Sequence, residues 1–153
     1  MPAADRTPVG VVRVCRHEQG AEAEVEDLLV TEEPLEIRLG HGPLDDRREM
    51  RLTVTMRTPG HDVELALGFL LTEGLITHAA QVLRVAYCQD VKPEESGNVV
   101  RVELVPELTI DPQRWQRNFY TTSSCGVCGK SSIDAVHAAC AVPLTPSPLP
   151  APE

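Results

Sequence analysis

Two cysteines stand three residues apart, at positions 125 and 128, in the stretch YTTSSCGVCGKSSID. A cysteine pair at this spacing can bind a metal ion, form a redox couple or carry a sulfur atom as a persulfide. The secondary structure around Cys125 and Cys128 distinguishes these three kinds of site.

The residues after the pair predict a helix. Ser131 and Asp134 have the spacing of a capping box, and SSIDAVHAACA then reads as a helix of about eleven residues. Cys125 and Cys128 thus precede a helix N-terminus, whose free N–H groups stabilise a thiolate, and Lys130 adds a positive charge. We expect these groups to lower the thiol pKa from its usual value of about 8.5. The site is suited to nucleophilic sulfur.

Zinc is the strongest alternative. Cys125 and Cys128, with His137 and Cys140 one turn apart on the predicted helix, would supply four ligands in the array C-x2-C-x8-H-x2-C. The eight-residue gap is not one of the usual spacings of zinc modules. We therefore prefer an ordinary helical role for His137 and Cys140, with zinc kept as the second hypothesis.

Two enzyme classes fit less well. A thioredoxin-like dithiol should follow directly on a core strand, whereas the NFYTTSS before Cys125 is polar and turn-like. A zinc deaminase needs H-x-E and P-C-x-x-C. Here His61 and Glu64 are one residue too far apart, and Ser124 replaces the proline. A reactive cysteine pair that carries sulfur as a persulfide remains compatible with the residues.

Composition limits the remaining classes. The chain has 153 residues, with 42% apolar and 24% charged, as in an ordinary globular protein. Its net charge of −9 argues against nonspecific nucleic-acid binding, and no apolar run is long enough to span a bilayer. The N-terminal MPAADRTPVG has no apolar secretory core either, so we expect a cytoplasmic protein, and five cysteines in a reducing compartment do not indicate a disulfide framework. Cys15 and Cys88 end predicted strands, where a small buried thiol is the ordinary explanation.

Strands and helices alternate along the chain, which predicts the α/β class. In EMRLTVTM, Met50, Leu52, Val54 and Met56 alternate with polar residues, which predicts a hairpin with one buried face. The stretch AEAEVEDLLVTEE reads as an exposed acidic segment. The predicted strands cover residues 9–15, 32–40, 49–56, 82–88 and 98–105.

One amphipathic helix is expected between the hairpin and the later strands. Thr58 and Pro59 have the types of an N-cap and a first helical residue, and Gly74 ends the helix. The predicted apolar stripe comprises Val63, Ala66, Leu67, Leu70 and Leu71.

The C-terminal composition differs from the rest. Prolines at positions 143, 146, 148, 150 and 152 favour extended conformation. We therefore expect one domain over residues 1–141 and a proline-rich disordered tail over residues 142–153.

Three stretches in the same order carry a family resemblance. EEPLEIRLG, MRTPGHDVELALGFLLTEGLI and NFYTTSSCGVCGKSSIDAV closely resemble the formate dehydrogenase accessory sulfurtransferase (FdhD) family. The resemblance covers about residues 31–136 and implies an α/β fold similar to that of cytidine deaminase.

The resemblance also implies a function. Members of that family accept sulfane sulfur from a cysteine desulfurase and pass it to the molybdenum bis-guanine-dinucleotide cofactor, which is then inserted into formate dehydrogenase. Matched motif to motif, Cys125 carries the persulfide and Cys128 assists. Lys130 would steady the thiolate or an anionic group of the cofactor. The implied protein is a sulfur carrier of the sulfurtransferase type with no permanently bound cofactor or metal.

Members of that family are considerably longer than this chain. We therefore expect no counterpart here to their C-terminal half, and we expect exposed apolar surface that this half would cover. Poor stability or self-association, for example as a homodimer, would follow.

Overall fold

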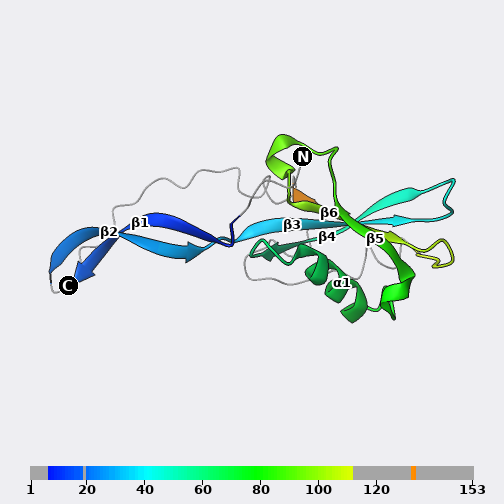
Figure 1. Cartoon of the computed structure of the whole chain (residues 1–153), viewed down its shortest axis with the longest axis horizontal. Helices are drawn as coiled ribbons and strands as arrows, with labels where there is room; N and C mark the ends of the chain where they lie inside the picture. Colours follow the sequence, from blue (N-terminus) through cyan, green and yellow to red (C-terminus); the bar gives the residue numbers. More distant parts are fainter. Residues whose placement is uncertain (1–6, 19, 112–131, 134–153) are drawn as a thin grey trace.

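The computed structural model describes residues 7–18, 20–111 and 132–133. In this part of the chain a four-stranded sheet carries one α-helix on one face, and a separate two-stranded hairpin extends from one end of the sheet (Figure 1). The elements in chain order are β1 (Val9–Glu18), β2 (Ala21–Val30), β3 (Glu33–His41), β4 (Arg48–Arg57), α1 (Asp62–Thr72), η1 (Ala79–Gln81), β5 (Val82–Tyr87), η2 (Pro93–Glu95) and β6 (Val99–Leu104). The α/β class predicted from the sequence is confirmed.

The four-stranded sheet has the order β4-β3-β6-β5. β3 pairs with β4 as the predicted antiparallel hairpin, and β5 pairs antiparallel with β6. β3 and β6 run parallel, so the chain between them must cross over the sheet, and α1 lies within that connection. The two central strands are therefore β3 and β6.

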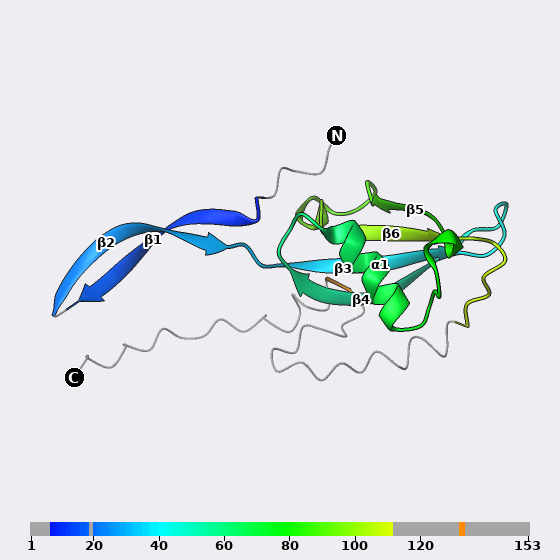
Figure 2. The same cartoon turned by 60° about the horizontal axis from the view of Figure 1, so that its bottom comes forward.

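The main core lies between α1 and the sheet (Figure 2). Alternate residues of the central strands point to α1, so Leu35, Ile37 and Leu39 of β3 are fully buried there. Burial of each such side chain stabilises the fold by roughly 1.5–3 kcal/mol. The other core residues are Met50, Leu52, Ala66, Leu70, Leu75, Ile76, Val100, Val102, Leu104 and Ile110.

A β-bulge changes the pattern predicted for β4. The register shifts between Ile37 and Arg38, and Leu52 is the extra residue on β4. Val54 therefore packs in a second apolar cluster with Val99 and Ile133, while Met50 and Leu52 belong to the main core. The prediction of one buried face for β4 was wrong because the extra residue of the bulge reverses which side chains point to each face, so Val54 points away from the face that Met50 and Leu52 share.

The helix α1 begins three residues later than predicted. Its N-cap is His61, whereas Thr58 and Pro59 precede it, separated from it by Gly60 with φ of 130°. That backbone conformation is open to glycine and cannot continue a helix. Gly74 follows the helix with φ of 73°, which confirms the predicted C-terminal glycine.

The buried face of α1 is narrower than the predicted stripe. Ala66 and Leu70 are fully buried, but Val63 and Leu71 are 39% and 52% exposed. The helix contacts the sheet along one line of residues, and its apolar flanks remain open to solvent.

A buried ion pair fixes the start of α1. Arg57 at the end of β4 donates from Nε and Nη2 to the two carboxylate oxygens of Asp62, each at 2.9 Å. Arg57 Nη2 also donates to Asn98 Oδ1, and the Tyr87 hydroxyl donates to Asp62 Oδ2, both at 2.9 Å. This network joins β4, α1, β5 and the residue before β6.

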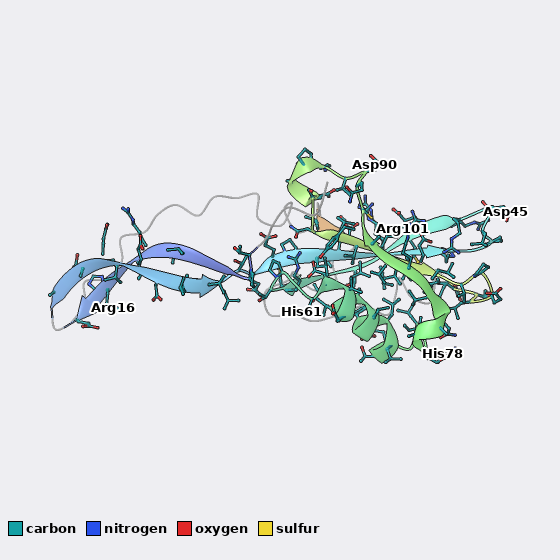
Figure 3. The ribbon with its side chains drawn as sticks, viewed as in Figure 1. Arg16, Asp45, His61, His78, Asp90 and Arg101 are labelled. Carbon is teal, nitrogen blue, oxygen red and sulfur yellow. The ribbon has the colours of Figure 1, made fainter. Side chains whose placement is uncertain are left out.

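The hairpin formed by β1 and β2 extends away from the four-stranded sheet (Figures 1 and 2). The acidic stretch is exposed as predicted, although it forms a strand. Exposed apolar side chains accompany it, with Val11 at 66% and Leu28 at 65% facing each other across the hairpin. Arg16 lies near the distal end of this hairpin, and Asp45 lies at the opposite end of the molecule (Figure 3).

The proline-rich segment 142–153 lies outside the described residues, so its predicted disorder stays a prediction. Within the part that the structure describes, no helix is long and apolar enough to cross a membrane.

The ion pair between Arg57 and Asp62 yields a stability prediction. Asp62→Asn leaves the buried guanidinium of Arg57 with only the more distant Glu33, 3.6 Å from Nη1, as counter-charge, so we expect the free energy of unfolding to fall by up to about 3–5 kcal/mol. Asp46→Asn is the matched control, because Asp46 pairs with Arg48 at 3.4 Å with both side chains mostly exposed. Urea titration followed by circular dichroism measures both. Equal losses for the two variants would contradict a special role for the buried pair.

The same network predicts a dependence of stability on alkaline pH. Burial, and then the hydrogen bond to Asp62, raise the pKa of Tyr87 to about 12. The neutral tyrosine is thus favoured in the folded state, and its contribution is complete below the unfolded pKa of about 10. It is lost as the pH rises from about 10 to about 12. Tyr87→Phe should lose less stability than wild type over this interval in urea titrations, and parallel losses would refute the assignment.

Candidate functional site

The predicted sulfur-handling residues fall in a segment that the structure does not describe. Cys125, Cys128 and Lys130 lie outside the described residues, as do His137 and Cys140 of the zinc hypothesis. Their roles stay predictions. Among the described residues no group of three or more His, Cys, Asp or Glu side chains is placed to hold a metal ion.

The structure does place the two residues that follow this segment. Ser132 is not helical and Ile133 is helical, in agreement with the predicted helix start within one or two residues. The Ile133 side chain is 1% exposed and packs against Val54 and Val99, on the face of the sheet opposite α1. The cysteine segment therefore ends at a fixed point on the sheet.

A carboxylate from β3 holds this point. The backbone N–H of Ile133 donates to Glu36 Oε2 at 3.1 Å, a bond between residues 97 positions apart in the sequence. The Glu36 side chain is completely buried. Arg38 Nε donates to the other oxygen at 2.6 Å, and Arg51 Nε lies 3.6 Å from it. A buried carboxylate is tolerated because donors occupy both oxygens.

The alternation of β3 explains why Glu36 lies there. Leu35, Ile37 and Leu39 point to α1, so Glu36 and Arg38 point to the other face. Ile133, Val54 and Val99 form an apolar part of that face, and charged side chains occupy the part beside it. Arg101, on the neighbouring β6, lies on this side of the sheet (Figure 3).

Ion pairs continue from Arg38 across the polar face. Arg38 Nη1 lies 3.3 Å from Glu49 Oε1, and Arg101 Nη1 lies 3.1 Å from Glu49 Oε2. Arg101 Nε lies 2.7 Å from Glu103 Oε1, and Arg47 Nη2 lies 2.6 Å from Glu103 Oε2. We call this set the ionic row, and it comprises Glu36, Arg38, Glu49, Arg101, Glu103 and Arg47.

Burial and charge act in opposite directions on Arg38. Burial alone lowers the pKa of Arg38, but its hydrogen bond to Glu36 and the charges of Glu36 and Glu49 outweigh burial and raise the pKa. Arg38 therefore stays cationic beside the buried carboxylate. Gly40 of β3 makes room for the row, because a Cβ there would lie 2.1 Å from Glu103 Oε2.

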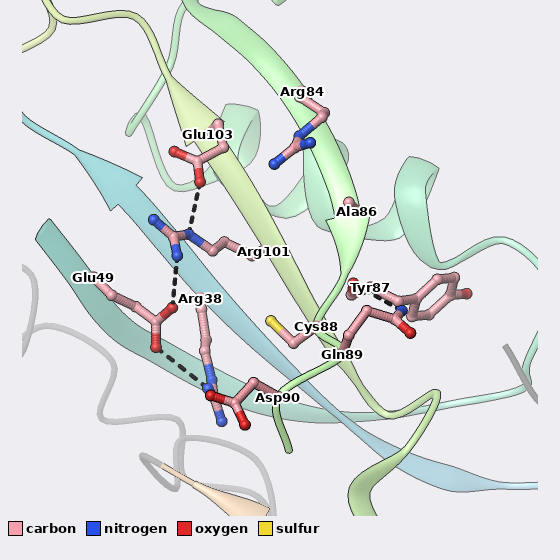
Figure 4. A pocket seen from close by; sticks show the side chains of 10 residues that line it. All are labelled: Arg38, Glu49, Arg84, Ala86, Tyr87, Cys88, Gln89, Asp90, Arg101 and Glu103. Atoms are coloured by element: carbon pink, nitrogen blue, oxygen red, sulfur yellow. Dashed lines mark hydrogen bonds and ion pairs between the residues drawn. The ribbon is translucent and has the colours of Figure 1, made fainter. Parts of the chain in front are cut away.

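A polar hollow opens beside the ionic row (Figure 4). Its volume is about 370 Å³, and the Cys88 side chain points into it between Arg38 and Arg101 (Figure 4). Cys88 also packs against the cluster of Val54, Val99 and Ile133. The lining residues are Arg38, Glu49, Arg84, Ala86, Tyr87, Cys88, Gln89, Asp90, Arg101 and Glu103.

A second hollow of about 400 Å³ adjoins the first. Arg38 and Asp90 line both hollows, and Arg51 and Lys92 line the second one. The residue that binds Ile133, Glu36, is thus paired with Arg38, which lines both hollows. Such a surface can hold a charged ligand group or a polar partner surface.

Sequence reasoning did not find Glu36 or Arg38 as site residues. The only signal was a pair of charged residues at alternate positions of an apolar strand, which normally indicates a solvent-exposed face. The residue that covers Glu36 lies 97 positions later, and nothing local in EEPLEIRLG indicates that contact.

Comparison with known proteins gives the family. The model of the FdhD/NarQ family matches residues 30–151. The chain belongs to this family. The match extends beyond position 136, where the resemblance had been expected to end, and includes most of the proline-rich segment. The hairpin β1–β2 lies almost entirely ahead of the matched range.

Curated relatives support the FdhD assignment. A sulfur carrier protein FdhD of Streptomyces coelicolor is 42% identical over 138 residues, which are 89% of this chain and 46% of the relative. The FdhD of Mycolicibacterium paratuberculosis is 50% identical over 112 residues, 72% of this chain and 38% of the relative. The chain spans less than half the length of these relatives.

A solved structure supports the fold. A formate dehydrogenase accessory protein from Desulfotalea psychrophila matches with a TM-score of 0.51 at 20% identity, over 69% of this chain and 38% of that one. The similarity to cytidine deaminase expected for this fold stays a prediction.

The two described cysteines yield a labelling prediction. Cys15 is exposed, contrary to the burial predicted for it, because both faces of the hairpin are open. Cys88 is half-buried, and burial raises the pKa of its thiol. At neutral pH Cys88 should react with iodoacetamide several-fold more slowly than Cys15. Peptide mass spectrometry over a time course measures both rates, and faster labelling of Cys88 would contradict the described packing.

Proposed function

We propose that this chain is a sulfur carrier in which Cys125 accepts sulfane sulfur from a cysteine desulfurase and holds it as a persulfide. The observation that carries the proposal is the 42% identity over 89% of the chain to a protein named sulfur carrier protein FdhD. The C-x-x-C pair before a helix start supplies thiols suited to this chemistry.

The loading step conserves electrons. The Cys125 thiolate attacks the terminal sulfur of the desulfurase persulfide, the S–S bond of the donor breaks, and a new S–S bond forms at Cys125. The donor cysteine leaves as a thiolate. The sulfane sulfur keeps its oxidation level, so the transfer needs no external oxidant or reductant.

Cys128 has a defined role in the release step. Its thiolate attacks the inner sulfur of the Cys125 persulfide, which forms a disulfide between Cys125 and Cys128 and expels hydrosulfide. The two thiols thereby supply the two electrons that reduce sulfane sulfur to sulfide. A dithiol reductant must then regenerate the pair.

The acceptor in this proposal is the molybdenum bis-guanine-dinucleotide cofactor, which acts as substrate and is destined for formate dehydrogenase. The name of the Desulfotalea protein, a formate dehydrogenase accessory protein, supports this destination. Lys130 and the arginines of the ionic row provide cations for its phosphate groups.

The proposal predicts where sulfur appears. After incubation of the full chain with a cysteine desulfurase and cysteine, the peptide that contains Cys125 should be heavier by one sulfur atom. Cys125→Ser should abolish this species. Cys128→Ser should load normally and accumulate the persulfide, because release is blocked. Mass spectrometry without reductant measures all three.

Cys88→Ser serves as the matched control, because Cys88 is a described thiol near the end of the cysteine segment. It should load like wild type. Sulfur found on Cys88 with none on Cys125 would refute the assignment of the carrier residue. Stoichiometric zinc that is lost on Cys140→Ser would refute the sulfur carrier in favour of the zinc hypothesis.

A further inference from the structure

Glu36 joins the centre of the sheet to the end of the cysteine segment by a hydrogen bond. Its Oε2 accepts the Ile133 N–H at 3.1 Å, and its side chain is completely buried. Burial of a carboxylate is costly in free energy, and a leucine or valine at this position would pack against the same apolar neighbours without that cost. The hydrogen bond to the Ile133 N–H therefore explains the carboxylate at position 36 better than packing does.

The two oxygens of Glu36 have separate partners. Oε1 accepts from Arg38 Nε at 2.6 Å, so the charge of Glu36 is balanced on that side. Oε2 remains for the Ile133 N–H. Ile133 is the first helical residue after the non-helical Ser132, and N–H groups at this position have no partner inside the helix. The carboxylate thus satisfies an N–H that would otherwise be buried and unpaired.

The bond acts together with apolar packing. The Ile133 side chain fits between Val54 of β4 and Val99 of β6, while its N–H is held from β3. Three strands therefore fix one residue. Cys128 is five residues away along the chain, so chain length alone keeps its Cα within roughly 18 Å of this anchor.

We propose that Glu36 is a positioning residue for sulfur transfer: its carboxylate anchors the end of the cysteine segment at the polar face of the sheet and so determines how Cys125 and Cys128 are presented to their partners. This inference rests on the proposed sulfur-carrier function. It adds Glu36, far from the cysteines in the sequence, to the residues that influence sulfur transfer. Glu36 acts through its hydrogen bond to the backbone N–H of Ile133.

Glu36→Gln tests the carboxylate directly. The glutamine replaces one acceptor oxygen by an NH₂ donor, and because Arg38 and the Ile133 N–H lie at separate oxygens, one of these two donors then faces the NH₂ group and loses its bond. We expect hydrogen exchange of the Ile133 amide, measured by NMR, to accelerate about tenfold or more, as is typical for loss of a bond to a charged group. Exchange of the Ile37 and Val100 amides should stay unchanged. Persulfide loading of Cys125 should slow by a similar factor.

Glu49→Gln is the matched control for charge. Glu49 also pairs with Arg38, and it lies in the same ionic row without an interaction with Ile133 among the described contacts. This variant should keep both the exchange rate of the Ile133 amide and the loading rate. An equal effect of the two substitutions would overturn the proposal, because the cause would then be the general charge of this face.

Ile133→Pro tests the donor instead of the acceptor. Proline is well tolerated at the first helical position, and it removes the N–H while Glu36 and Arg38 remain intact. Ile133→Val is its control, since it keeps the N–H and most of the apolar side chain. We expect loading to slow for proline and to stay near wild type for valine. If Glu36→Gln does not fold, Ile133→Pro and Ile133→Val together test whether the bond between Glu36 and Ile133 affects sulfur loading.

Unchanged loading in folded Glu36→Gln or Ile133→Pro would overturn the positioning role. If wild type itself does not load sulfur, the proposed function fails. The anchor is then tested by the alkylation rates of Cys125 and Cys128, which Glu36→Gln should change and Glu49→Gln should not. Equal alkylation rates in all these proteins would overturn the anchor as well.

Discussion

Strand β3 is buried on both faces, and the arrangement of the other described elements around the sheet follows from that constraint. Residues 35–40 are all buried, although they include Glu36 and Arg38. The apolar residues of the strand require α1 on one side. The charged residues require partners on the other side, and besides each other these come from β4 and from the start of the helix at Ile133. One strand thus organises both an apolar layer and a polar layer.

Two buried ionic groups illustrate different uses of charge. The pair of Arg57 and Asp62 belongs to a network that joins β4, α1, β5 and the residue before β6 at one end of the helix. The pair of Arg38 and Glu36 begins a row that reaches an open polar surface. Buried ion pairs add little net stability compared with apolar residues, but they restrict geometry strongly, because each charge must keep its partner. A site that must present reactive groups in a defined place benefits from that restriction.

The sequence predicted the class of the fold, the hairpin of β3 and β4, and the strands β5 and β6, because their apolar and β-branched runs are local signals. It misplaced the start of α1, since Thr58 and Pro59 have cap-like types while Gly60 takes a non-helical conformation. It also missed the bulge beside Arg38, which depends on pairing between strands. The cysteine pair was visible as a motif. Glu36 was not, because its role arises from a contact 97 positions away.

Among the described residues no third strand pairs with the hairpin of β1 and β2, and strand edges of this kind can recruit a strand from another molecule. The acidic side chains Glu22, Glu24 and Glu26 all lie on β2, whereas Arg13 and Arg16 lie on β1. Two copies that met through their β2 edges would bring like charges into register, which is unfavourable. β1 of a second copy, with Arg13 and Arg16, has the opposite sign and suits the β2 edge better, so the charge segregation favours head-to-tail addition of β1 to β2 over pairing of two β2 edges.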